Sequence, residues 1–158
     1  AEAGNYLAQY NVGISYLEGI GTEKNSVLAA KWMNKSAKYG YVGAQYCMAL
    51  MYEKGEGVPQ SFKKAYDYWG LAAKQNMIEA QFKIAEYLMF GLHGKKDVEA
   101  SLIILSELQA RRFPPALFLM GSFFIRDKAT YNKGVALIKQ AAMLGYHNAV
   151  EYITQNNI

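Results

Sequence analysis

The chain has 158 residues, of which 52% are hydrophobic and 19% are charged, so its composition predicts a folded domain with a sizeable core rather than a disordered chain. The formal net charge is +4, but lysine and arginine are scattered and adjoin only in short pairs such as Lys63-Lys64, Lys95-Lys96 and Arg111-Arg112. A nucleic-acid-binding protein usually gathers its positive charge into one stripe, so we expect no nucleic acid as a partner.

The chain opens with residues 1–4, which match the end of a later segment. Ala1 and Gly4 stand 36 residues before Ala37 and Gly40, which close a predicted helix. We therefore interpret residues 1–4 as the end of a preceding repeat, and the chain as a fragment of a longer array. On this interpretation, upstream repeats of the same chain are expected neighbours of the first helix.

A short motif recurs along the chain with constant spacing. It reads Ala-Gln-Tyr at residues 8–10 and 44–46, Ala-Gln-Phe at 80–82 and Ala-Leu-Phe at 116–118, each 36 residues after the one before. Self-similarity with a period of about 20 to 50 residues is the signature of a repeat solenoid, in which each unit buries its apolar face only against its neighbours. The spacing predicts a single repeat domain over residues 1–158, with repeats at 5–40, 41–76, 77–112 and 113–148 and a capping helix at 149–158.

The second repeat shows the predicted unit most clearly. Ala44, Met48 and Tyr52 fall on one stripe of a helix. Residues 55–59, Gly-Glu-Gly-Val-Pro, then break that helix, because glycine tolerates φ > 0 and proline cannot extend the preceding helix. A second helix follows from about Ser61, so the repeat is predicted to be a hairpin of two short helices.

The first repeat has the same order of elements, with Gly19-Ile20-Gly21 as its break. Nothing in the chain is typical of a strand. Four aromatic side chains stand at the expected internal contacts of the first two hairpins and are predicted to lie in the core: Tyr16, Trp32, Tyr52 and Tyr68.

The third and fourth repeats depart from this pattern. The loop from Gly91 to Gly94 has one extra residue between its glycines, and the loop of the fourth repeat is three residues shorter and has Asp127 in place of the first glycine. Residues 113–125 form the longest apolar stretch, but they include two prolines and are fewer than the about 20 residues that a bilayer span needs. We therefore expect one buried helix there and no direct membrane span.

The spacing within each repeat resembles a known family. The pattern Ala-Gln-Tyr-x-x-Gly-x-x-Tyr-x-x-Gly-x-Gly from Ala8 to Gly21, with Ala29-x-x-Trp32-x-x-x-Ser36-Ala37-x-x-Gly40 after it, is similar to the Sel-one-like repeat, a close relative of the tetratricopeptide repeat. Residues 44–73 match this pattern better still, and the likeness covers nearly the whole chain. The resemblance implies an all-α fold, a right-handed α-α superhelix of helical hairpins with about 36 residues per repeat, whose first helices line the concave side.

The resemblance also implies a class of function. Family members serve as adaptors or regulators, many of them in bacterial envelope, secretion and host-contact systems, so we expect a non-catalytic module whose partner is another protein or a peptide. An immunity- or inhibitor-type protein that neutralises a partner enzyme is the alternative, and a cell-wall-related hydrolase is a distant one. Relatives linked with cell-wall precursors carry paired cysteines, whereas this chain has one. The compartment stays open between a bacterial envelope or secreted location and the cytoplasm.

Groups suited to catalysis are scarce. Cys47 is the only cysteine and is expected as a small buried side chain on a first helix, while His93 and His147 are expected as solvated turn residues. Catalysis needs a nucleophile and an acid–base partner within reach, and a metal ion needs more ligands than these three side chains supply. We therefore expect no catalytic residue, no metal site and no cofactor.

The candidate binding surface is a stripe on the first helices, two, six and nine residues after the alanine that opens each motif. In the resembled fold this stripe lines the concave groove, although its aromatic members could instead pack between neighbouring repeats. Leu17 belongs to the stripe in the first repeat. The residues predicted to bind a partner are Tyr10, Ile14, Tyr46, Leu50, Glu53, Phe82, Glu86, Met89 and Phe118.

Overall fold

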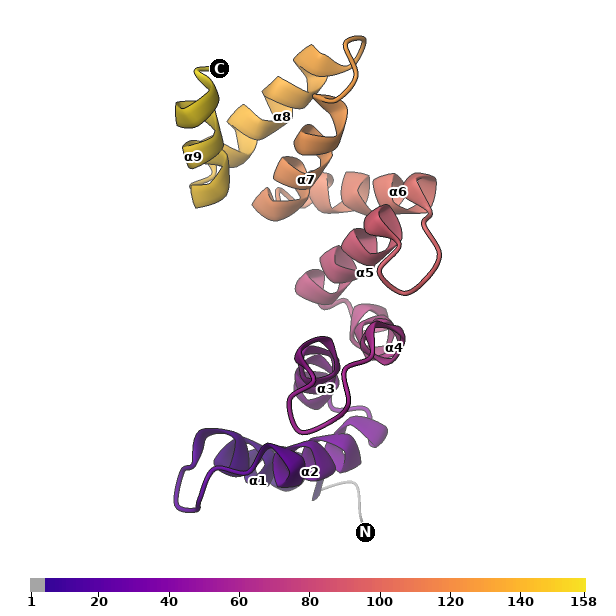
Figure 1. The fold of residues 1–158 in the computed structure, drawn as a ribbon, viewed down its shortest axis with the longest axis vertical. Coiled ribbons are helices and arrows are strands. Elements are labelled where there is room, and N and C mark those ends of the chain that lie inside the picture. The colour runs from indigo at the N-terminus through magenta and orange to yellow at the C-terminus, as the bar shows by residue number, and fades with distance from the viewer. Residues whose placement is uncertain (1–4) are drawn as a thin grey trace. The chain divides into compact units, whose positions relative to one another are not determined.

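A computed structural model describes residues 5–158, which form nine α-helices and contain no strand (Figure 1). The helices are α1 Tyr6–Glu18, α2 Ser26–Lys38, α3 Val42–Lys54, α4 Phe62–Lys74, α5 Ile78–Phe90, α6 Val98–Ala110, α7 Pro114–Phe124, α8 Tyr131–Met143 and α9 His147–Asn156. The predicted all-α class is confirmed for these residues. Residues 1–4, predicted to end a preceding repeat, lie outside them.

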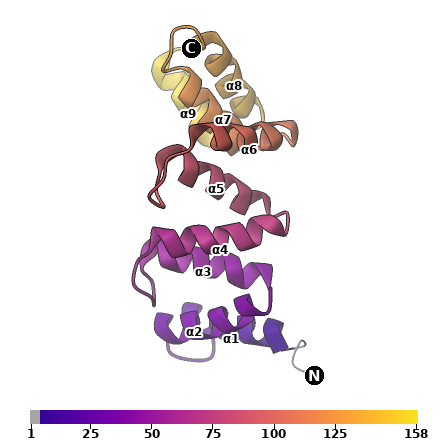
Figure 2. The ribbon, with the colours of Figure 1, turned by 90° about the vertical axis from the view of Figure 1, so that its right-hand side faces the viewer.

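The helices group into two compact units. Unit 1 is the chain up to Lys96 and holds α1 to α5, and unit 2 is Asp97–Ile158 and holds α6 to α9. In unit 1 the hairpin α1–α2 is followed by the hairpin α3–α4, and α5 packs on α4 (Figure 2). In unit 2 the hairpin α7–α8 contacts α6 through α7 and α9 through α8. The division follows the loop that has an extra residue between its glycines in the third predicted repeat.

Capping residues at the repeat spacing define the ends of several helices. The side chains of Asn25, Ser61 and Asp97 accept hydrogen bonds from backbone N–H groups three residues later, which begin α2, α4 and α6. Such caps satisfy N–H groups that have no partner inside the helix. The helices α1, α3 and α5 end at glycines in the left-handed conformation, as the glycine breaks predicted.

Small residues let the two helices of a hairpin approach closely. Gly13, Ala49 and Gly121 occupy the same position in their repeats, and all three are buried. A Cβ atom on Gly13 would lie 3.0 Å from the side chain of Met33, and one on Gly121 would lie 2.8 Å from the carbonyl oxygen of Gly134. The close contacts α1–α2 and α7–α8 therefore depend on these glycines.

In the second helices, the largest buried side chain stands one residue after the aromatic position that was expected in the core. Met33 and Trp69 are fully buried, and Leu105 and Ile138 fill the corresponding positions in unit 2. The aromatic residues expected in the core are only half-buried: Tyr16, Trp32, Tyr52 and Tyr68. Successive side chains on a helix point about 100° apart, so a shift of one residue moves a side chain from the interior to the edge of the hairpin.

Tyr68 shows why such an edge position suits a tyrosine. Its ring stacks on Tyr52 with centroids 5.7 Å apart, and its hydroxyl donates a hydrogen bond of 2.7 Å to Oδ1 of Asn34. The ring of Tyr68 is thus packed, and its hydroxyl has a hydrogen-bond partner on the preceding hairpin. A half-buried position at the edge of a hairpin allows both contacts at once.

The glutamine of the Ala-Gln-Tyr motif joins consecutive hairpins. Gln45 is buried on α3, and its Nε2 donates to the carbonyl oxygen of Ala37 at the end of α2. Gln75, at the end of α4, donates to Oε1 of Gln45 at 2.8 Å and to the carbonyl oxygen of Gly40 at 2.9 Å. Buried polar groups need such partners, so this glutamine explains part of the repeat motif.

The loop between α3 and α4 also lies against the preceding hairpin. Gly57 has φ +70°, and a Cβ atom there would come within 2.0 Å of the carbonyl oxygen of Ser26 at the start of α2. Only glycine permits both this backbone conformation and this approach. Gly21, the equivalent residue of the first repeat, has φ +69° but nothing within 4 Å of its Cβ position.

Across residues 5–158, no helix is both long enough and apolar enough to cross a membrane. The apolar residues 113–125 comprise α7 and its two capping residues, and Ala116, Leu117 and Met120 of this helix are buried in unit 2. The helix α9 begins two residues before the predicted capping segment, and its last turn is exposed and polar. A capping role for it stays a prediction.

Candidate functional site: the stripe face of unit 1

The stripe positions of α1, α3 and α5 form one surface of unit 1, which we call the stripe face. Its members are Tyr10, Ile14 and Leu17 on α1, Tyr46, Leu50 and Glu53 on α3, and Phe82, Glu86 and Met89 on α5. Eight of these nine side chains are half-buried, whereas Met89 is only 3% exposed and lies in the interior. Met89 therefore offers almost no surface of its own to a ligand.

The aromatic members of the stripe support the packing between elements. The ring of Tyr10 meets Tyr41 at the start of α3 in an edge contact of 4.9 Å, and the ring of Tyr46 meets Trp69 of α4 at 5.2 Å. In unit 2, Phe118 contacts Tyr146 and Tyr152 at 5.5 and 6.0 Å. Tyr10 thus contacts the next repeat, as one of the two sequence-based interpretations expected, whereas Tyr46 contacts the second helix of its own repeat. Each of these rings remains partly open to solvent.

A charged cluster joins α3 and α5 on the stripe face. Lys83 Nζ lies 2.9 Å from Oε2 of Glu86 and 3.9 Å from Oε1 of Glu53, and the hydroxyl of Tyr87 donates to that Glu53 oxygen at 2.9 Å. The side chains of Glu53 and Glu86 are 18% and 27% exposed. Two carboxylates share one ammonium group, so the cluster carries one negative charge in excess on a chain whose net charge is +4.

This environment changes the acidity of two members of the cluster. Burial, and then the hydrogen bond to Glu53 and its charge, hold the pKa of Tyr87 far above its usual value, so that residue stays neutral. Partial burial tends to lower the pKa of Lys83, but its hydrogen bond to Glu86 and the charges of both glutamates raise that pKa above the ordinary value. Lys83 therefore stays charged and Tyr87 stays a donor throughout the physiological pH range.

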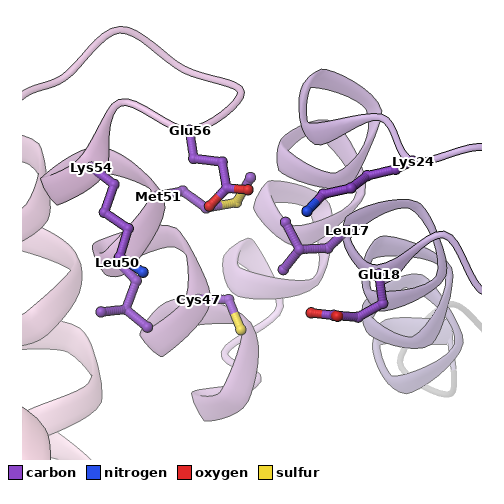
Figure 3. Close-up of a pocket in the computed structure, with 8 residues that line it drawn as sticks. All are labelled: Leu17, Glu18, Lys24, Cys47, Leu50, Met51, Lys54 and Glu56. Atoms are coloured by element: carbon purple, nitrogen blue, oxygen red, sulfur yellow. The ribbon is translucent and has the colours of Figure 1, made fainter.

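A cavity of about 260 Å³ lies between α1 and α3 at one end of the stripe face (Figure 3). Its floor consists of Leu17, Cys47, Leu50 and Met51. Four charged side chains surround it: Glu18 from the end of α1, Lys24 from the following loop, Lys54 from the end of α3, and Glu56 from the loop after it. Figure 3 shows these groups projecting from the two sides toward the space between them.

Cys47 differs from the expected buried side chain, because it is half-buried and lines this cavity. The gap between α1 and α3 is not filled by neighbouring side chains at this point, which leaves the thiol accessible. Burial raises the pKa of the Cys47 thiol above its usual value, and a hydrogen bond with Tyr10 offsets part of that rise. A neutral thiol is a poor nucleophile.

The two histidines lie apart from the cavity and occupy different environments. His93, expected as a solvated turn residue, is half-buried and stacks on Tyr66 of α4 with ring centroids 4.1 Å apart and planes 6° from parallel. The loop with the extra residue brings this ring onto α4. His147 is the first residue of α9 and is exposed. Within residues 5–158, no group of three or more His, Cys, Asp or Glu side chains could hold a metal ion.

Sequence reasoning missed Lys83 and Tyr87, the two residues that hold the carboxylates of the cluster in place. Their repeat equivalents are Asn11, Cys47 and Leu119 for Lys83, and Ser15, Met51 and Phe123 for Tyr87. Because these positions change their chemistry in every repeat, the periodic pattern contains no signal for them. The only available signal was the spacing of Lys83 and Glu86, which places opposite charges on one face of a helix.

The recurrence of paired helices at a constant spacing places the chain among the helical-repeat proteins. The model of the Sel1 repeat matches residues 7–41, 42–77, 78–106 and 114–146, and the chain belongs to this family. The match indicates a family of structural repeats and no enzymatic family.

Two solved structures share the fold. A Sel1 repeat protein from Oxalobacter formigenes aligns with a TM-score of 0.81 and 27% identity over 93% of this chain and 60% of that one. The c5321 protein, a protective antigen present in uropathogenic Escherichia coli strains that displays an SLR fold, has a TM-score of 0.81 over 94% of this chain and 33% of its own. Its 24% identity supports the fold alone. The predicted solenoid of helical hairpins is confirmed.

Curated relatives are longer proteins. "Protein SHC1" of Saccharomyces cerevisiae is 29% identical over 118 residues, which cover 75% of this chain and 22% of that protein. "Chitin synthase regulator SKT5" of the same yeast is 30% identical over 121 residues, covering 72% and 17%. "ERAD-associated E3 ubiquitin-protein ligase component HRD3B" of Arabidopsis thaliana is 28% identical over 100 residues, covering 62% and 15%. This chain spans less than a quarter of the length of each.

Proposed function

We propose that this chain is a non-catalytic interaction module that binds a segment of another protein across the stripe face of unit 1. The observation that carries the proposal is the cluster of Glu53, Lys83 and Glu86, where half-buried carboxylates are held in place by Lys83, which also interacts electrostatically with Tyr46. Interfaces between proteins combine such aromatic surface with a few oriented polar groups.

The excess negative charge of this cluster suits a partner segment that carries lysine or arginine. A basic side chain placed against Glu53 and Glu86 would neutralise the charge that Lys83 leaves uncompensated. Fixed carboxylates lose little side-chain freedom on binding, which lowers the entropic cost of the contact. Two relatives are a chitin synthase regulator and a component of an E3 ubiquitin-protein ligase, and these roles support a binding function.

The proposal can be tested with a random peptide library displayed on phage and selected on the immobilised 158-residue chain. Peptides that bind should be enriched in basic residues. Substituting Glu53→Gln together with Glu86→Gln should weaken the binding of a synthetic selected peptide about tenfold or more, which corresponds to about 1.4 kcal/mol. Fluorescence anisotropy gives the dissociation constants.

The matched control is Asp67→Asn, which removes a carboxylate from an exposed position of α4. This variant should bind the peptide as the unchanged chain does. Thermal denaturation of all variants is measured in parallel, so that a loss of stability is not mistaken for a loss of contact. If the chain selects no peptides above background, or if Asp67→Asn weakens binding as much as the double variant, the stripe face is not a binding surface.

A further inference from the structure

We infer that the cavity between α1 and α3 is an anchor pocket that takes one large apolar side chain of the bound segment. This inference rests on the proposed function and specifies the chemistry of the partner: a protein segment with an aromatic or long aliphatic residue, whose main chain crosses the charged groups around the pocket.

The size and floor of the pocket fit such a side chain. An apolar cavity of about 150 Å³ is enough to hold a benzene ring, and this one measures about 260 Å³. Leu17 and Leu50 are half-buried and partly accessible, Met51 closes the bottom, and Cys47 contributes a neutral thiol. An apolar group that leaves water for this floor gains a hydrophobic contribution from the part of its surface that the floor covers.

The equivalent gap one repeat later demonstrates that the pocket is not a general consequence of the fold. The four floor residues Leu17, Cys47, Leu50 and Met51 correspond, 36 residues on, to Glu53, Lys83, Glu86 and Tyr87. Those four polar residues contact one another by the ion pairs and the hydrogen bond of the charged cluster. Between α1 and α3, these positions of the repeat hold apolar side chains and a cavity remains. Between α3 and α5, the same positions hold polar side chains that bond to one another.

The charges around the pocket complement a peptide main chain. Glu18 and Glu56 can accept hydrogen bonds from backbone N–H groups, and Lys24 and Lys54 can donate to backbone carbonyl oxygens. None of these four side chains lies within ion-pair distance of another charge in residues 5–158. Their charges sum to zero, which favours a neutral apolar side chain over a charged group at the centre of the pocket.

The first test introduces the residues of the next repeat into the pocket. Leu17→Glu copies Glu53 and Leu50→Glu copies Glu86, and each places a charge where the apolar side chain would sit. Each variant should weaken binding of the selected synthetic peptide at least tenfold. The control is Val27→Glu on α2, which makes the same kind of change at a position that is 65% exposed and outside the pocket, and it should leave binding within about twofold. Replacing the apolar anchor of the peptide by alanine should cause the same loss, and the two losses should not add when combined.

The second test uses the unchanged chain, so it does not depend on the folding of any variant. Cys47 is the only cysteine and lines the pocket, so its labelling rate with a maleimide dye reports directly on occupancy. A saturating concentration of the selected peptide should slow labelling at least tenfold, whereas the peptide with alanine at its anchor, at a concentration that also saturates, should leave the rate within twofold.

The outcomes separate this inference from the proposed function. Suppose that peptides bind and that Glu53→Gln with Glu86→Gln weakens their binding, but that Cys47 of the saturated chain is labelled as fast as in the free chain and Leu50→Glu binds normally. The inference of an anchor pocket is then wrong, and the stripe face is still a binding surface. If no peptide binds, both fail. If sedimentation velocity finds a dimer that Leu50→Glu dissociates, the occupant is a second copy of this chain and the inference is overturned.

Discussion

Cys47 illustrates how the surroundings of one side chain decide its chemistry. The residue stands on α3 at a position where a buried small side chain was expected, yet the unfilled gap between α1 and α3 leaves its thiol half-buried at the cavity. Burial disfavours the charged thiolate, and the hydrogen bond with Tyr10 favours it by a smaller amount, so the pKa of the Cys47 thiol stays above the ordinary value.

We expect the alkylation rate of Cys47 by iodoacetamide to rise with pH through a midpoint above the value of about 8.5 that is typical of a free cysteine. Only the thiolate reacts, so a raised pKa moves the midpoint upward. Tyr10→Phe should move it higher still, because the hydrogen bond that favours the thiolate is lost. Tyr16→Phe, on the same helix, is the control and should leave it unchanged. A midpoint at or below that of free cysteine would show that burial does not control this thiol.

At the residue scale, features that recur could be predicted from the sequence, and features of a single repeat could not. The glycine breaks at Gly19 and Gly55 recur, and both glycines adopt the left-handed conformation that their role as helix stops requires. Tyr87 stands where the other repeats have serine, methionine or phenylalanine, none of which carries a phenol hydroxyl, so its hydrogen bond to Glu53 follows from no pattern. His93 was expected to be solvated, but its ring stacks on Tyr66. This contact could not be predicted, because it depends on the path of one atypical loop.

Among the elements, the hairpin was the most predictable unit because its requirements are local. Apolar residues at helical spacing, a capping side chain and a glycine stop together specify two short helices and the turn between them. The contact of one hairpin with the next depends on details that the helical period does not contain. The loop at Gly57 is an example, because it rests on the carbonyl group of Ser26 in the preceding repeat.

The substitution Gly57→Ala should therefore destabilise unit 1 more than Gly21→Ala. Both residues have φ near +70°, so both alanine variants pay the cost of a left-handed backbone, about 1 to 2 kcal/mol. Only at Gly57 does the added methyl group also meet the backbone of Ser26, which should cost about 1 to 3 kcal/mol more. Urea denaturation followed by circular dichroism measures both losses of free energy. Equal losses would mean that the loop does not press on the preceding hairpin.

Over the whole molecule, the family and the class of fold follow from the period of 36 residues, because a repeat that cannot bury its apolar face alone must stack on its neighbours. The fold does not identify a function, which depends on particular sites. Two sites with distinctive chemistry lie in unit 1: the pocket between α1 and α3 and the charged cluster between α3 and α5. Unit 2 presents Phe118 at the predicted stripe position, packed against Tyr146 and Tyr152.

We propose that a protein segment binds along the stripe face of unit 1, and the methyl groups of the seven methionines provide a test of this binding site. With ¹³C-methyl methionine incorporated, NMR spectra recorded with and without the selected peptide report on sites in both units. Met51 forms the floor of the pocket, whereas Met120 and the 88% exposed Met143 lie in unit 2. We predict that the peptide shifts the signal of Met51 most and leaves those of Met120 and Met143 unchanged. If the bound peptide shifts the signal of Met120 or Met143 and leaves that of Met51 unchanged, the peptide binds elsewhere than on the stripe face.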